Sequence, residues 1–262
     1  MDKNIYLTKS EQYVFNLISK IDITTNKEIK DILPDFDEKK INKICYKLMK
    51  KKYLRMLKKG LYLVQKEGKF AVENPFKIAL SIYPGYIGFS SALKFYELIE
   101  YEPFTVFVVT KHHSRNIPLG QYSFKYTAIG KRAVGATYSK GIWVSTVEKT
   151  FFDCFYKPQY AGGYSVITKA LNQQRKMNWD RFLYFFKNFA SNPLCQRTGY
   201  ILDILRETDF SFPQKVLRYL ENSIKTNTKL LPTAPSQGEF IKEWKLIDNV
   251  GKENILSWWY HG

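Results

Sequence analysis

The chain has 262 residues and carries 41 Lys and Arg against 24 Asp and Glu, giving a formal net charge of +17 at pH 7. A charge of this sign and size favours polyanionic partners, DNA or RNA first and an anionic membrane as a weaker candidate. Three scattered cysteines without a C-x-x-C pair argue against a disulfide framework or a zinc site and indicate a reduced, cytoplasmic protein. No apolar run reaches the roughly 18 residues of a membrane span, and the N-terminus lacks the apolar core of a secretory signal, so we expect no membrane association.

Three helices with clear start signals are predicted in the first 52 residues. Two S/T-x-x-E capping boxes stand at Thr8–Glu11 and Thr25–Glu28, each able to satisfy the free N–H groups of a helix start. Asp37 is predicted to cap a third helix over residues 37–52. Pro34 cannot continue the second helix and forces a turn. This order is typical of a helix-turn-helix unit.

The third helix separates apolar and basic side chains onto opposite faces when it is drawn at about 100° per residue. The apolar face, expected to pack on the first two helices, comprises Ile41, Ile44, Cys45 and Leu48. The face expected to meet DNA comprises Lys39, Lys40, Asn42, Lys43, Tyr46, Lys47 and Lys50. The third helix of such a unit enters the major groove, where Asn42 is suited to a bidentate contact with adenine.

A basic hairpin is predicted after the third helix. Two strands, at residues 53–57 and 61–64, are joined by Lys58, Lys59 and Gly60. Gly60 can take the positive φ that a tight turn requires. A helix-turn-helix followed by such a hairpin is typical of a winged helix, in which Lys58 and Lys59 are expected to touch phosphate or the minor groove. The alternative is that these lysines only solvate an exposed surface.

The rest of the chain is predicted to form a larger mixed α/β domain. The expected fold class is therefore α+β, with a winged helix-turn-helix domain at residues 1–68 and a second domain at residues 69–262. Two tryptophans near the C-terminus, Trp258 and Trp259, indicate that this end docks onto the domain. The expected strands are 105–110, 123–129 and 141–144, and the expected helices are 92–100, 145–156, 164–175, 179–190, 196–207 and 213–223, followed by an exposed loop at 226–238.

No catalytic signature is evident, so we expect no enzyme activity, no cofactor and no metal. His112 and His113 are adjacent and would point to opposite faces of a strand. Residues 243–245 have the E-x-K spacing found in one nuclease motif, but they lack a clear upstream Asp partner. Two alternatives to a DNA-binding regulator therefore stay open. One is a nucleic-acid-processing enzyme whose winged helix delivers substrate, and the other is a protein-interaction scaffold.

Three segments of the chain resemble the AbiEi family of antitoxins: YIGFSSALKFYELIEYEPFTVFVVTK, VSTVEKTFFDCFYKPQYAGGYSVITKAL and RTGYILDIL. The resemblance spans nearly the whole chain, because that family also opens with a winged helix-turn-helix. The positions that carry it are Val144, Ser145, Thr146, Glu148, Lys149, Asp153, Pro158, Gly162 and Gly163, together with a helix start at Arg197, Thr198, Gly199 and Tyr200.

This resemblance implies a role in bacterial or archaeal abortive infection, also called type IV toxin–antitoxin defence against phage. It implies a transcriptional autorepressor that binds inverted repeats at its own promoter, as a homodimer or through cooperative binding. It also implies that the second domain antagonises a nucleotidyltransferase-like toxin without requiring a stable complex. Structural roles account for the matching positions, with Ser145 or Thr146 as a helix cap and Pro158 and the glycines as a turn, so no toxin-binding site is assigned.

Overall fold

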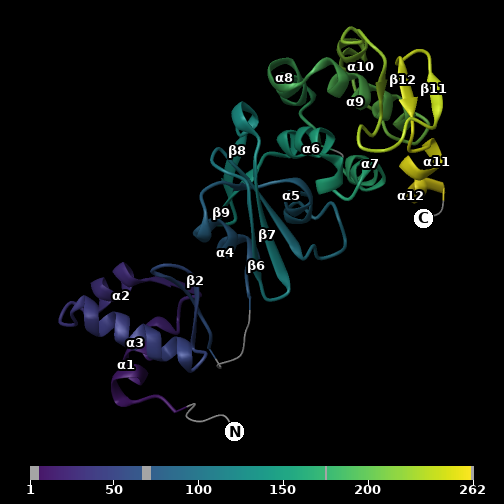
Figure 1. The fold of residues 1–262 in the computed structure, drawn as a ribbon. Helices are drawn as coiled ribbons and strands as arrows, with labels where there is room; N and C mark the ends of the chain where they lie inside the picture. The colour runs from purple at the N-terminus through teal and green to yellow at the C-terminus, as the bar shows by residue number, and fades with distance from the viewer. Residues whose placement is uncertain (1–5, 67–71, 175, 261–262) are drawn as a thin grey trace. The chain divides into compact units, whose positions relative to one another are not determined.

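The computed structural model describes residues 6–66, 72–174 and 176–260 (Figure 1). The chain divides into two compact units, here called unit 1 (Met1–Pro84 and Pro118–Tyr122) and unit 2 (Gly85–Ile117 and Ser123–Gly262). The expected boundary at residues 68 and 69 lies outside the described residues. Helices and three sheets occur together along the chain, which confirms the predicted α+β class. In the described part of the chain, no helix combines the length and apolarity needed to cross a bilayer.

Unit 1 combines helices with a small antiparallel sheet of order β1-β3-β2. Strand β1 was not predicted, because three residues are too few to show an alternating pattern. The register shifts between Met56 and Lys58, so Lys58 ends β2 and only Lys59 and Gly60 form the turn. The elements are α1 (Lys9–Ile18), β1 (Ile23–Thr25), α2 (Asn26–Ile32), α3 (Glu38–Lys50), β2 (Leu54–Lys58), β3 (Leu61–Val64) and α4 (Pro75–Ile82).

The first three helices of unit 1 begin where their caps predict. Both capping boxes, Thr8–Glu11 and Thr25–Glu28, are complete, with the hydroxyl and the carboxylate each accepting a backbone N–H. The carboxylate of Asp37 accepts the N–H of Lys40 at 2.6 Å. The core beneath these helices includes Val14, Ile18, Ile29, Ile41, Ile44, Cys45 and Leu48.

Unit 2 contains a mixed six-stranded sheet of order β6-β7-β5-β4-β9-β8. Parallel pairs join β5 to β7 and β4 to β9, whereas β4–β5 and β8–β9 are antiparallel. The predicted strands match β5, β7 and β9, but three others were missed: β4 has two residues, β6 is largely exposed, and β8 is short and lies at the edge of the sheet. The strands are β4 (Tyr86–Ile87), β5 (Thr105–Thr110), β6 (Arg115–Leu119), β7 (Tyr122–Ala128), β8 (Ala136–Ser139) and β9 (Ile142–Ser145).

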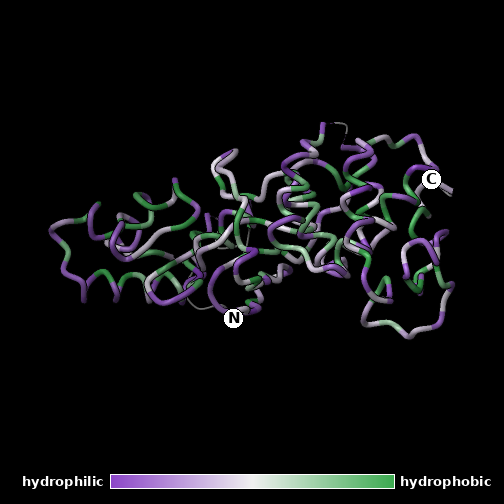
Figure 2. The backbone as a smooth tube through the Cα atoms, turned by 90° about the horizontal axis from the view of Figure 1, so that it is seen from above, coloured by the Kyte–Doolittle hydropathy of each residue, from purple (hydrophilic) through white to green (hydrophobic). Residues whose placement is uncertain are grey.

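Helices follow and flank this sheet, and along them green hydrophobic and purple hydrophilic stretches alternate, as amphipathic helices require (Figure 2). Two expected starts are wrong. α5 begins at Phe89, so Ser91 lies inside it and its hydroxyl accepts the N–H of Phe107 at 2.8 Å. α9 begins at Asn192, with Pro193 in its first turn, so residues 197–200 lie mid-helix. The helices are α5 (Phe89–Phe95), α6 (Val147–Tyr156), α7 (Tyr164–Gln173), α8 (Trp179–Phe189), α9 (Asn192–Leu205) and α10 (Gln214–Glu221).

The C-terminal part of unit 2 is more ordered than predicted. The segment expected to be an exposed loop contains a short strand of a third sheet, of order β10-β12-β11. The docking prediction is confirmed, since Trp258 Nε1 donates to Thr168 Oγ1 at 2.8 Å. The remaining elements are β10 (Thr228–Lys229), β11 (Glu239–Ile241), β12 (Leu246–Asp248), α11 (Lys252–Ile255) and α12 (Ser257–Tyr260).

Candidate nucleic-acid interface

The predicted DNA-facing side chains of α3 all lie on its solvent side. The helix buries Ile41, Ile44, Cys45 and Leu48. Tyr46 is 56% exposed, although it is aromatic. The exposed set is Lys39, Lys40, Asn42, Lys43, Tyr46, Lys47 and Lys50, which is the whole set predicted from the sequence for this helix. One helix therefore presents a basic surface, here called the α3 basic face, opposite the apolar stripe that anchors it.

The ammonium groups of this face differ in how they are held. Lys40 Nζ lies 3.6 Å from the ring centroid of Phe36, and Lys50 Nζ lies 5.5 Å from that of Tyr46. Lys47 Nζ approaches Glu11 Oε1 at 3.7 Å. Lys43 forms no ion pair with any described residue, so its charge is fully available to an anion. The centre of the face is thus less neutralised than the flank next to α1.

Asn42 is already engaged in the structure. Its Oδ1 accepts a hydrogen bond from Asn26 Nδ2 at 2.8 Å, and the Asn26 N–H donates to Gly60 O at 3.1 Å. These bonds tie α3, the start of α2 and the hairpin turn together. A bidentate contact to adenine uses both the oxygen and the nitrogen of the amide, so in this contact the Asn42 oxygen either accepts from Asn26 and the base together or releases Asn26.

Glu11 of α1 binds Lys51 at the C-terminal end of α3. The capping box predicted only the bonds between Glu11 and Thr8, and not this contact. The Glu11 side chain is buried, and its Oε2 lies 2.7 Å from Lys51 Nζ and accepts the Thr8 N–H at 2.8 Å. Burial alone would raise the pKa of Glu11, but the hydrogen bonds from Lys51 and Thr8 and the charge of Lys51 bring it below its ordinary value. Lys51 is 40 residues from Glu11 in sequence, so no local spacing could have identified it.

The hairpin offers one available ammonium group where two were predicted. Lys58 is exposed, but its Nζ donates to Ile82 O at 2.8 Å, at the C-terminus of α4. Lys59 is exposed in the turn and forms no ion pair within the described residues. Lys59 is therefore the better placed of the two to meet a phosphate, while Lys58 joins β2 to α4.

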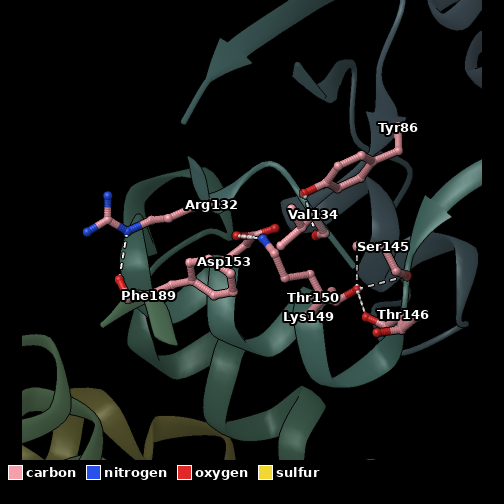
Figure 3. A network of polar contacts seen from close by, with 9 residues as sticks. All are labelled: Tyr86, Arg132, Val134, Ser145, Thr146, Lys149, Thr150, Asp153 and Phe189. Atoms are coloured by element: carbon pink, nitrogen blue, oxygen red, sulfur yellow. Dashed lines mark hydrogen bonds and ion pairs between the residues drawn. The ribbon is translucent and has the colours of Figure 1, made fainter. Parts of the chain in front are cut away.

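Four of the positions that carry the family resemblance, Ser145, Thr146, Lys149 and Asp153, belong to a buried network around the start of α6 (Figure 3), whereas Gly162 is exposed. Lys149 and Asp153 are both fully buried and form an ion pair one helical turn apart. Ser145 Oγ lies 2.7 Å from Thr150 Oγ1, within hydrogen-bond distance. Thr146 occupies the helix cap position, but its hydroxyl makes no capping bond. These residues support the core of unit 2 and offer no surface to a partner.

Burial dominates the electrostatics of this pair. It raises the pKa of Asp153 to about 6, although the ammonium of Lys149 acts in the opposite direction. Burial also lowers the pKa of Lys149. The rings of Phe152 and Tyr86 lie 5.2 and 5.9 Å from Lys149 Nζ. The second oxygen of Asp153 has no hydrogen-bond partner, so Lys149 is the main stabiliser of the carboxylate.

The segment with nuclease-like spacing lies in the turn before β12. Trp244 is buried, and its Nε1 donates to Asp203 Oδ2 at 3.1 Å, whereas Glu243 and Lys245 are exposed. Glu243 borders an open pocket of about 1000 Å³ beside α9. No three His, Cys, Asp or Glu side chains in the described part of the chain are grouped so as to hold a metal ion.

Comparison with known proteins adds information on the fold alone. No protein-family model matches the chain, and no curated protein matches its sequence. Its structure is similar to the crystal structure of the RV2827C protein from Mycobacterium tuberculosis, with a TM-score of 0.68 and 13% sequence identity. The alignment covers 92% of this chain and 90% of that one, so the two share an architecture along nearly their whole length.

Proposed function

We propose that this chain is a DNA-binding transcriptional autorepressor and the antitoxin of a type IV toxin–antitoxin system. In this proposal unit 1 is a winged helix that reads inverted repeats in the chain's own promoter. Unit 2 antagonises a nucleotidyltransferase-like toxin encoded nearby. The observation that carries the DNA-binding part is the α3 basic face, which is exposed and has at its centre Lys43, a lysine without an ion pair among the described residues.

The order of elements in unit 1 supports a major-groove reader. Two capped helices precede α3, the sheet follows it, and the β2–β3 turn presents Lys59 beyond the helix. In helix-turn-helix proteins the recognition helix lies in the major groove while neighbouring elements contact the backbone. The lysines supply affinity through phosphates, and Asn42 is the side chain on this face suited to reading a base.

A gel-shift titration of the purified chain tests this part. The ligands are its upstream promoter DNA and a scrambled duplex of equal length, each at two salt concentrations. About five phosphate contacts predict a slope of log K against log salt near −4 to −5. Preference for the promoter with such a slope supports an autorepressor. Equal binding to both duplexes, or binding insensitive to salt, contradicts it, and the latter would favour a protein-interaction scaffold.

The antitoxin part rests on the resemblance of residues 86–111, 144–171 and 197–205 to the AbiEi family. Its test is a growth assay in which the neighbouring toxin gene is induced with and without this chain. Rescue of growth by the chain, and by a variant that no longer binds DNA, supports antagonism by unit 2. If the variant that no longer binds DNA also fails to rescue growth, the effect is assigned to transcriptional repression.

A further inference from the structure

A 45-residue stretch that belongs to unit 2, apart from residues 118–122, has no carboxylate side chain. Residues 103–147 hold six Lys or Arg and two His but no Asp or Glu, and they include five of the six strands of the large sheet. At the chain's own frequency of 24 acids in 262 residues, about four would be expected in this length. The sheet of unit 2 is therefore a second basic region, separate in sequence from the α3 basic face.

Lys125 and Arg132 of this region form a continuous row of alternating cations and tyrosine rings with Tyr156, Lys157 and Tyr160, which follow it in the chain. Lys125 Nζ lies 4.2 Å from the ring centroid of Tyr160, and Lys157 Nζ lies 5.4 Å from the same centroid. Lys157 Nζ is also 5.4 Å from the centroid of Tyr156, whose ring faces Arg132 Cζ at 4.7 Å. All five side chains are half-buried, so each is fixed by packing and still reaches solvent.

The three cations of this row keep their charge for an outside anion. None of them lies within ion-pair distance of an Asp or Glu among the described residues. Arg132 Nε donates to Phe189 O at 2.9 Å, which fixes the guanidinium (Figure 3). The two terminal nitrogens of Arg132 make no contact with the other residues drawn there. Cations held by aromatic rings, rather than by carboxylates, form a preorganised anion-binding surface.

Two open aromatic rings project from the same face of the sheet. Lys125 of β7 is paired with Phe107 of β5, so the two side chains lie on one face of the sheet. Side chains alternate between the faces along each strand, and the pairing of β5 with β4 and of β4 with β9 places Trp143 on this same face. Tyr138 is the cross-strand neighbour of Trp143, their ring centroids lie 5.5 Å apart, and they are 63% and 51% exposed. Three strand spacings of about 4.8 Å put Trp143 roughly 14 Å from β7, and a fourth puts Tyr138 roughly 19 Å from it.

We propose that unit 2 binds single-stranded nucleic acid along this face. Lys125, Lys157 and Arg132 contact phosphates, and Trp143 with Tyr138 stacks on unpaired bases. Proteins that bind single strands combine a basic track with aromatic side chains in this way, whereas duplex DNA hides its base faces within the stack. The site shares no residue with the α3 basic face, so an experiment can contradict one of the two binding proposals and leave the other standing.

Fluorescence anisotropy of the full chain with labelled 20-nucleotide RNA, DNA of the same sequence, and promoter duplex tests the proposal. Lys125→Gln combined with Lys157→Gln should weaken single-strand binding about tenfold and leave duplex binding within twofold. Two lost phosphate contacts at about 0.7 each should lower the salt slope by about 1.4. Trp143→Ala should weaken single-strand binding about tenfold without changing that slope. Lys43→Ala should weaken only duplex binding.

Matched variants separate this site from general basicity and from misfolding. Lys225→Gln combined with Lys242→Gln removes the same charge from exposed positions elsewhere in unit 2 and should leave binding unchanged. Lys125→Arg combined with Lys157→Arg keeps both charges and should retain single-strand binding. Stronger binding of RNA than of DNA would identify RNA as the ligand, and equal binding would identify the shared phosphate backbone. The proposal is overturned if the glutamine pair and its control have equal effects, or if no single strand binds.

Discussion

Replacing Lys149 with Met should destabilise unit 2 strongly, because it leaves the carboxylate of Asp153 buried without its counter-charge. Both side chains are fully buried, and the second oxygen of Asp153 has no hydrogen-bond partner to compensate. Breaking a buried pair by removing one member costs about 3–5 kcal/mol. Replacing both members, with Lys149→Met and Asp153→Leu, removes the stranded charge and should return the free energy of unfolding to within about 1–2 kcal/mol of the wild type.

The pH dependence of this effect has a definite sign. The pKa of Asp153 is raised by burial to about 6, above its ordinary 3.8, so its contribution favours the folded state at low pH and is lost as pH rises from about 4 to 6. Without Lys149 the pKa of Asp153 rises further, and the folded protein can neutralise the carboxyl by binding a proton. The destabilisation caused by Lys149→Met should therefore be smaller at pH 5 than at pH 8.

Urea unfolding followed by tryptophan fluorescence measures this change, because all five tryptophans lie in unit 2. Lys187→Met, which changes an exposed lysine of the same unit, is the control for loss of charge. A Lys149→Met protein as stable as the wild type at pH 8 would show that Lys149 does not stabilise the buried carboxylate of Asp153. If the double variant is as unstable as Lys149→Met alone, the unpaired carboxylate of Asp153 is not the cause of the destabilisation.

Three further substitutions have expected outcomes. Gly199→Ala would place a Cβ 2.2 and 2.3 Å from two carbon atoms of the Trp244 ring and should destabilise unit 2 by about 1–3 kcal/mol, measured as a lower urea midpoint at unchanged slope. Thr25→Ala removes the hydroxyl that caps α2 and should cost about 1 kcal/mol, detected as faster hydrogen exchange of that helix; unchanged exchange would contradict the cap. The pKa of Glu11 is lowered, so its stabilising contribution is lost as pH falls, and Lys51→Ala should flatten the acid side of the stability profile of unit 1.

Local signals predicted unit 1 well. The caps at Thr8, Thr25 and Asp37 are side-chain–backbone bonds between residues three apart, so spacing alone identified them. The positions of the exposed lysines followed from helical periodicity. What periodicity could not supply were tertiary contacts, such as the bond from Lys58 to the end of α4 and the pairing of Asn42 with Asn26.

Unit 2 shows why tertiary context overrides local pattern. A helix was expected from residue 92, yet α5 begins at Phe89, and the hydroxyl of Ser91 within it accepts a hydrogen bond from the sheet. Gly199 resembled part of a helix start, but it lies within α9, where its missing side chain admits the Trp244 ring. The row of cations and tyrosines joins β7 to the segment after α6, so it exists only once the chain has folded.

The proposed reading of promoter DNA by the α3 basic face depends on Lys43, which can be tested with a single substitution. Binding of the promoter duplex is measured over a range of salt for the wild type, Lys43→Ala and the control Lys242→Ala, which removes an exposed lysine from unit 2. If Lys43 contacts a phosphate, its loss should weaken binding and lower the salt slope by about 0.9, while the control stays at the wild-type value. Equal affinity and equal slope for Lys43→Ala and the wild type would contradict α3 as the DNA-binding helix.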